Sequence, residues 1–121
     1  MNKRNIILIG MPGAGKSSVG VILAKVLGYE FIDTDLVIQH REKRLLREII
    51  ADEGNEGFLA IENEVNATLE ADKSVIAPGG SAIYGKEAME HFKEIGTIVY
   101  LKLSYEDLAL SLIHISEPTR H

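Results

Sequence analysis

The sequence contains no cysteine and no tryptophan, and only three of its 121 residues are proline. Without cysteine the chain can form neither a disulfide nor a thiolate metal site. Basic residues are also few, because 13 Lys and Arg stand against 18 Asp and Glu, for a formal net charge of -5. This acidic balance, without a basic cluster, argues against a nucleic-acid or acidic-membrane partner.

Long hydrophobic runs are missing as well. The run nearest the N-terminus, Ile6–Ile9, has four residues, which is far too short for a signal peptide or a membrane span. We therefore expect a cytoplasmic protein with no membrane partner. At 121 residues, 45% of them hydrophobic, the chain has the size of one domain, and we expect the complete protein to be a monomer.

Short β-branched runs alternate with helical patterns along the chain. The runs predict strands at residues 5–9, 31–33, 75–77 and 97–101. Apolar residues three and four positions apart predict helices around residues 19–27, 45–50, 58–69 and 88–95. Gly28, Gly54 and Gly96 stand where glycines that end helices are expected. Buried strands alternating with amphipathic helices are typical of an α/β fold, with a parallel sheet covered on both sides.

The first predicted strand leads directly into GMPGAGKSS, residues 10–18, which opens the first helix. This segment matches G-x-x-x-x-G-K-[ST], the P-loop, whose glycines let backbone N–H groups surround phosphate oxygens. We expect Lys16 to reach the β- and γ-phosphates and the Ser17 hydroxyl to ligate Mg²⁺. A dinucleotide fingerprint fails, because Ser18 occupies its third glycine position. The residues predicted to bind the nucleotide are Gly10, Gly13, Ala14, Gly15, Lys16, Ser17 and Ser18.

Two carboxylates follow the second predicted strand in FIDTDL, residues 31–36. Ligands of open parallel sheets bind beyond the carboxyl ends of the strands, so both face the P-loop if this strand lies beside the first. Asp33 could then hold Mg²⁺ through a water, and Asp35 could orient a substrate hydroxyl or accept its proton. Alternatively, Asp33 or Thr34 caps the helix that follows.

The third predicted strand ends in PGGS, residues 78–81. Many P-loop proteins carry an acidic Mg²⁺ residue at the end of such a strand, and none stands here. Its absence shifts the expected metal binding to Ser17 and Asp33. The glycine pair is either part of a binding site or an ordinary turn.

Together these motifs resemble those of the shikimate kinase family of small P-loop kinases. GMPGAGKSS, FIDTDL, GFLAIE and APGGSA occur in the family's order and at similar spacing within residues 5–109. The resemblance implies a three-layer α/β/α fold with a parallel sheet in the order 2-3-1-4-5. It also implies that ATP phosphorylates a small-molecule hydroxyl, converting shikimate to shikimate 3-phosphate.

The resemblance also assigns roles to individual residues. Lys16 and Ser17 would bind the ATP phosphates and Mg²⁺, with Asp33 in the outer metal shell. Asp35 would bind the hydroxyls of the substrate and act as the catalytic base, with Lys16 as the second catalytic group. The other implied substrate contacts are Glu62, Gly79, Gly80 and Ser81, the last of which replaces a family glycine.

One departure from the family concerns the substrate. The family usually has F-R-x-x-E at the start of its substrate helix, and the Arg binds the shikimate carboxylate. Here Leu59 follows Phe58, and leucine cannot form a bidentate carboxylate pair. Losing such a charge-assisted contact typically costs about 1.5–3 kcal/mol. Alternatively, Leu59 is only a packed apolar residue.

Two other functions stay open at this point. One is a sister kinase of the same fold that acts on another small hydroxylated metabolite, which Leu59 would favour. The other is a non-enzymatic NTP-binding switch. The absence of a guanine-reading N-K-x-D motif from the sequence argues against this function.

The last stretch, LSLIHISEPTRH, shows no amphipathic period and breaks the family pattern. From Leu110 to Arg120 it equals a translation of transposase-adapter DNA used in sequencing libraries. We therefore expect a C-terminally incomplete kinase domain at residues 1–109 and a non-native tail at residues 110–121. On this interpretation the chain is truncated after its fourth strand, lacks the family's lid, fifth strand and C-terminal helix, and is inactive as given.

Overall fold

A computed structural model describes residues 4–10 and 16–101 of the chain. The predicted nucleotide contacts Gly13, Ala14 and Gly15, and the predicted tail at residues 110–121, lie outside this range. In chain order the elements are β1 (Asn5–Gly10), α1 (Lys16–Leu27), β2 (Glu30–Asp33), α2 (Thr34–Glu42), α3 (Leu46–Ala67), β3 (Ser74–Ala77), the 3₁₀ helix η1 (Gly80–Tyr84), α4 (Lys86–Ile95) and β4 (Gly96–Leu101). None of the helices described is long and apolar enough to cross a membrane.

The four described strands form one parallel sheet in the order β2-β3-β1-β4. The predicted fold class is thus confirmed, and these strands follow the expected order. The expectation that Asp33 and Asp35 both face the P-loop required β2 to lie beside β1. This condition is not met, because β3 lies between β1 and β2. Asp33, at the end of β2, is paired with Ala77 at the end of β3. The end of β2 therefore adjoins the PGGS segment, and not the end of β1.

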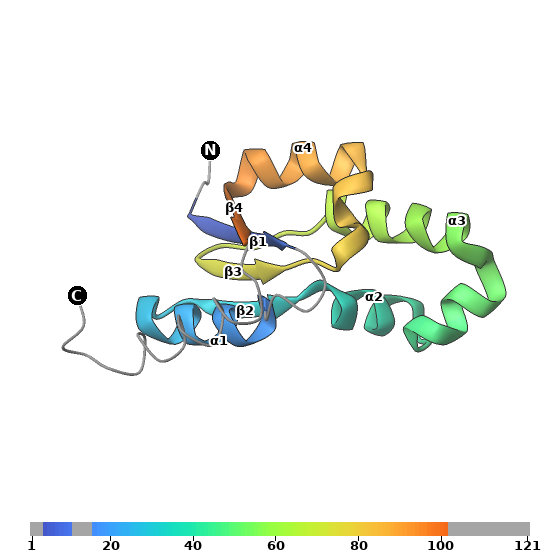
Figure 1. The fold of residues 1–121 in the computed structure, drawn as a ribbon, viewed down its shortest axis with the longest axis horizontal. Helices are drawn as coiled ribbons and strands as arrows, with labels where there is room; N and C mark the ends of the chain where they lie inside the picture. The colour runs from blue at the N-terminus through green and yellow to red at the C-terminus, as the bar shows by residue number, and fades with distance from the viewer. Residues whose placement is uncertain (1–3, 11–15, 102–121) are drawn as a thin grey trace.

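Helices cover both faces of the sheet, as the buried strands require. Ile7 and Ile9 point to one face and pack with Phe92 of α4. Leu8, between them in β1, points to the other face and packs with Ala24 of α1. Figure 1 shows the resulting three layers, with α4 on one side of the sheet and α1 on the other.

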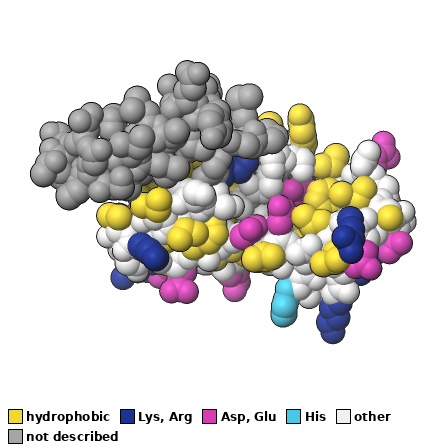
Figure 2. Space-filling view, turned by 60° about the horizontal axis from the view of Figure 1, so that its bottom comes forward, with side chains coloured by type: hydrophobic (Ala, Val, Ile, Leu, Met, Phe, Trp, Pro, Cys, Tyr) yellow, Lys and Arg dark blue, Asp and Glu magenta, His cyan; other side chains and the backbone are white. Residues whose placement is uncertain are grey.

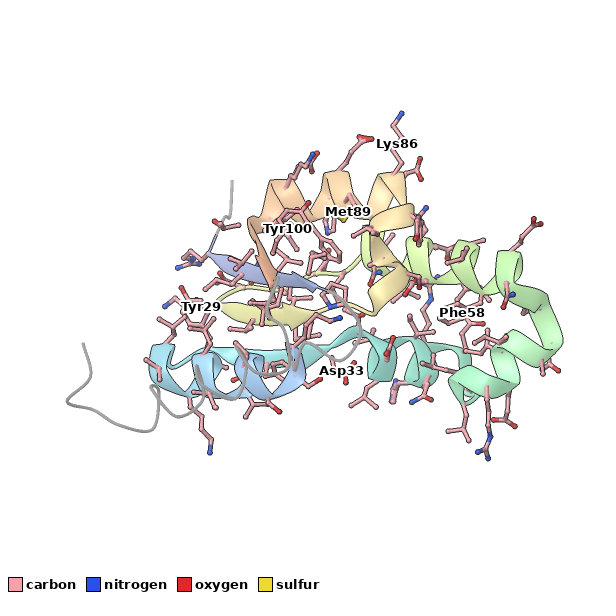
Figure 3. All side chains as sticks on the ribbon, in the orientation of Figure 1. Tyr29, Asp33, Phe58, Lys86, Met89 and Tyr100 are labelled. Carbon is pink, nitrogen blue, oxygen red and sulfur yellow. The ribbon has the colours of Figure 1, made fainter. Side chains whose placement is uncertain are left out.

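Helices α2 and α3 extend beyond the end of the sheet and pack against each other (Figure 1). Their own hydrophobic cluster centres on Ile38, Ile49 and Val65, and Phe58 packs against it (Figure 3). Gly54 breaks α3 with the non-helical angles φ 76° and ψ 174°, which favour glycine. The helix predicted before Gly54 and the stripe predicted after it therefore belong to two arms of one bent element.

A side chain from α3 caps the start of α4. The N-cap residue, Gly85, has no side chain, and Asn63 Oδ1 accepts the N–H of Ala88 at 2.9 Å instead. Asn63 Nδ2 also donates to Glu87 Oε1 at 2.9 Å. A Cβ on Gly85 would lie 2.3 Å from Asn63 Oδ1, so the close approach requires glycine. This contact holds the end of η1 against α3.

Candidate active site

The start of α1 carries the described part of the predicted P-loop. Lys16 is the first residue of α1, and its Nζ donates to the backbone oxygen of Gly10 at 3.1 Å. Ser17 and Ser18, in the first turn of α1, are exposed. The lysine thus lies against the end of β1, and the two hydroxyl residues stand at the helix N-terminus, where anions are favoured.

Asp33 stands at the boundary between β2 and α2 (Figure 3). It is the N-cap of α2, since its Oδ1 accepts the backbone N–H of Asp35 at 2.9 Å. The capping alternative is therefore confirmed for Asp33. Figure 2 turns the side of α1 and α2 toward the viewer, and acidic side chains lie among hydrophobic ones near the middle of this face.

Two carboxylates from different helices meet at the glycine that follows β3. A Cβ on Gly79 would lie 2.9 Å from Asp35 Oδ1 of α2 and 3.1 Å from Glu62 Oε2 of α3. A side chain at this position would press against both oxygens, so glycine lets the two carboxyl groups lie close to the backbone. The structure therefore brings together three of the predicted substrate contacts, while Gly80 is exposed at the start of η1.

Glu62 is 2% exposed and holds a fourth predicted contact in place. Ser81 Oγ donates to Glu62 Oε1 at 2.7 Å, whereas Glu62 Oε2 has no hydrogen-bond partner among the described residues. Leu59, one turn earlier in α3, lines a cavity of about 280 Å³ together with Glu62 and Ser81. Asp35 and Gly79 are not among the residues that line this cavity, which adjoins the candidate site through Glu62 and Ser81. No spacing in the sequence indicated the bond between Ser81 and Glu62.

The two carboxyl groups carry shifted pKa values. Burial raises the pKa of Asp35 above its ordinary value, the negative charge of Asp33 adds to this, and Lys16 opposes it. Burial also raises the pKa of Glu62; the hydrogen bond from Ser81 opposes the rise, and the charge of Asp35 adds to it. A carboxyl with a raised pKa near a lysine is suited to accept a proton.

These shifts predict a pH-dependent stability. A carboxyl whose pKa is raised by folding binds its proton more tightly in the folded chain than in the unfolded chain. Its contribution to stability is fully present below pH 4.5, the ordinary pKa of glutamate, and is lost as the pH rises through the raised value. We therefore expect Glu62→Gln to gain in unfolding free energy relative to the parent chain as the pH rises from 4.5 to neutral.

Urea titrations at several pH values measure this difference, and Glu87 offers the matched control. Its hydrogen bond from Asn63 lowers the pKa of Glu87, so Glu87→Gln should lose stability relative to the parent chain as the pH rises. The effect at Glu87 should be small, because that side chain is exposed. The same sign of change for both variants would contradict the assignment.

Residues 12–119 match the family model described as Shikimate kinase. The chain belongs to the shikimate kinase family. A shikimate kinase of Chlorobium phaeovibrioides is 40% identical over 110 residues, which cover 90% of this chain and 56% of that protein. Shikimate kinase 2 of Yersinia enterocolitica is 39% identical over 106 residues, covering 88% of this chain and 61% of that protein.

Solved structures of the family share the fold. The shikimate kinase of Acinetobacter baumannii in complex with shikimate superposes with a TM-score of 0.75 at 36% identity, covering 88% of this chain and 60% of that one. The enzyme of Bacteroides thetaiotaomicron gives a TM-score of 0.74 at 32% identity, with 86% and 60% covered. This chain therefore spans about three fifths of the length of the family members that it matches.

Proposed function

We propose that this protein transfers the γ-phosphoryl group of ATP to a hydroxyl of a small molecule, and that the acceptor is shikimate. The observation that carries the proposal is the position of Asp35, which adjoins Gly79 and is influenced by the charge of Lys16, in a chain of the shikimate kinase family. The names of the relatives and the shikimate complex of the A. baumannii enzyme support the acceptor. We also propose that the complete protein is a monomer and that it is located in the cytoplasm.

The residues at the start of α1 fit an ATP–Mg²⁺ complex. Gly10, the P-loop glycines, Lys16 and Ser18 would surround the phosphates, and Ser17 would ligate Mg²⁺, with Asp33 holding it through a water. The described residues contain no cluster of three metal-binding side chains, so the metal would depend chiefly on phosphate oxygens and a hydroxyl. When bound, Mg²⁺ neutralises charge on the transferring phosphoryl group.

Asp35 would perform the proton transfer. Its carboxylate would accept the proton of the acceptor hydroxyl as that oxygen bonds to the γ-phosphorus and the bond to the ADP oxygen breaks. Glu62, Gly79, Gly80 and Ser81 would surround the acceptor. The raised pKa of Asp35 strengthens it as a base, and the charge of Lys16 opposes the rise.

A second candidate function follows from Leu59. Because this residue lines the cavity with Glu62 and Ser81, it would face the acceptor with an apolar side chain. An acceptor without a carboxylate at that position would lose no binding energy when the family's arginine is replaced by Leu59. A sister activity on another small hydroxylated metabolite is therefore the alternative.

The test compares acceptors and restores the family's arginine. ADP release and acceptor binding by NMR are measured for shikimate and for neutral polyols, with the parent chain and with Leu59→Arg. We expect shikimate to bind, and Leu59→Arg to raise its affinity about tenfold to hundredfold by adding a charge-assisted contact. Acceptor binding is measured in addition to turnover because the chain spans only about three fifths of the length of its relatives.

Val26→Arg is the matched control, since Val26 is 75% exposed near the end of α1 and lies apart from the cavity. It adds the same charge and should leave the affinity for shikimate unchanged. Binding and turnover of a neutral polyol without shikimate would favour the second candidate. Binding of neither class of acceptor would contradict the proposal.

A further inference from the structure

We infer that Ser81 is a positioning residue that holds Glu62 so that the free Glu62 Oε2 receives a hydroxyl group of the acceptor beside Asp35. The inference rests on the proposed function, because the acceptor is the molecule phosphorylated there. It assigns to the site an acceptor that presents two hydroxyl groups, one to each carboxyl.

The first argument is the placement of Ser81. At the start of the 3₁₀ helix η1 the N–H of Ala82 donates to the oxygen of Gly79 at 3.0 Å, and Gly85, which Asn63 of α3 contacts, is its C-cap. Ser81 is therefore held between two fixed points, against the same helix that carries Glu62. Its 2.7 Å hydrogen bond to Glu62 Oε1 joins these two elements.

The second argument is that Glu62 has no cationic partner among the described residues. The ion pairs found there join Arg4, Arg41 and Arg44 to other carboxylates. One turn before Glu62, the side chain is that of Leu59. A buried carboxylate needs hydrogen bonds in place of water, and Ser81 supplies the one that the structure shows.

The third argument is the position of the unpartnered oxygen. Buried polar atoms nearly always have a hydrogen-bond partner, and Glu62 Oε2 has none among the described residues, which indicates a ligand or a bound water. That oxygen and Asp35 Oδ1 both lie about 3 Å from the place where a Cβ of Gly79 would be. Two acceptor oxygens on either side of a bare backbone match two neighbouring hydroxyl groups of a small molecule.

The charged groups around the pair decide what removing Ser81 would do. Asp35 faces Glu62, while Asp33 and Lys16 act on Asp35. Without the Ser81 hydroxyl, the ionised form of Glu62 loses its donor and the repulsion by Asp35 remains. Glu62 should then hold its proton to higher pH, and its carboxyl should no longer have one preferred orientation.

The first experiment follows the carboxyl groups by ¹³C NMR titration of the 121-residue chain, with signals assigned through Glu62→Gln and Asp35→Asn. In Ser81→Ala the pKa of Glu62 should rise, and in Ser81→Thr, which keeps the hydroxyl, it should return towards the parent value. Thr68→Ala is the control, because it removes a hydroxyl that bonds only backbone oxygens near the end of α3. Equal Glu62 titrations in the parent chain and Ser81→Ala would overturn the inference.

The second experiment measures shikimate binding by the same variants. Ser81→Ala should weaken it about fivefold to twentyfold, as expected for a disturbed hydrogen bond to a charged group, and Ser81→Thr should restore it. Unchanged binding in Ser81→Ala, with the titration shift present, would overturn the acceptor role of Glu62. Loss of binding in every chain, the parent included, would count against the proposed function and leave the coupling of Ser81 to Glu62 standing.

Discussion

Asp35→Asn is expected to lower kcat about 10²–10⁴-fold, the usual loss when a general base is removed. An amide of the same shape cannot accept the proton of the acceptor hydroxyl. The cap of α2 should survive, because Asp35 contributes only its backbone N–H to the bond with Asp33. ADP release with saturating acceptor measures the effect in a chain of the relatives' full length, since the 121-residue chain spans only about three fifths of it.

The same variant should be more stable than the parent chain at neutral pH. Burial disfavours the charge of Asp35, Asp33 and Glu62 repel it, and Lys16 offsets only part of this, so a neutral side chain removes a net cost. A loss of activity together with a gain in stability separates a catalytic role from damage to the fold. Urea unfolding at pH 7 measures the gain in unfolding free energy.

Asp72→Asn is the control, since this exposed carboxylate pairs with Arg4 on the surface. It should leave kcat unchanged. The unfolding free energy should change by no more than about 0.5 kcal/mol. Parent-like turnover by Asp35→Asn would show that Asp35 is not the base.

The largest loss of stability is expected from Asn5→Ala. Asn5 is 1% exposed at the start of β1. Its Nδ2 donates to the backbone oxygens of Ala71 and Ile95, each at 2.9 Å, and its Oδ1 accepts the N–H of Ser74 at 3.0 Å. One side chain therefore joins the starts of two strands to the end of α4.

Alanine in this position would remove three hydrogen bonds and open a cavity. A hydrogen bond contributes about 0.5–1.5 kcal/mol and the cavity adds to the loss, so we expect a total loss of about 3–5 kcal/mol. Because a domain of this size is stable by about 5–15 kcal/mol, the loss would remove a large share of the stability of the fold. Urea unfolding followed by circular dichroism measures the loss.

Asn55→Ala provides the comparison, because Asn55 is exposed in α3. It should change the unfolding free energy by less than about 0.5 kcal/mol. A loss below 1 kcal/mol for Asn5→Ala would mean that its three hydrogen bonds contribute little to the fold.

Local patterns in the sequence determined the class of the fold. The β-branched runs marked the four described strands, and the apolar spacing marked the helices that cover them. Gly28, predicted to end α1, has φ 71°, a conformation in which glycine is favoured. The P-loop could be recognised because its residues are consecutive and its chemistry depends on few neighbours.

The tertiary structure decided which of these residues act together. Local patterns could not show that β3 would separate β1 from β2, and only the family resemblance implied it, since strand order depends on how distant segments pack. The same holds for the bond from Ser81 to Glu62, 19 residues apart, and for the meeting of Glu62 with Asp35 at Gly79. The sequence by itself determined the elements and the nucleotide motif, whereas the acceptor side of the site depended on long-range packing, because carboxyl groups from separate helices meet only in the folded chain.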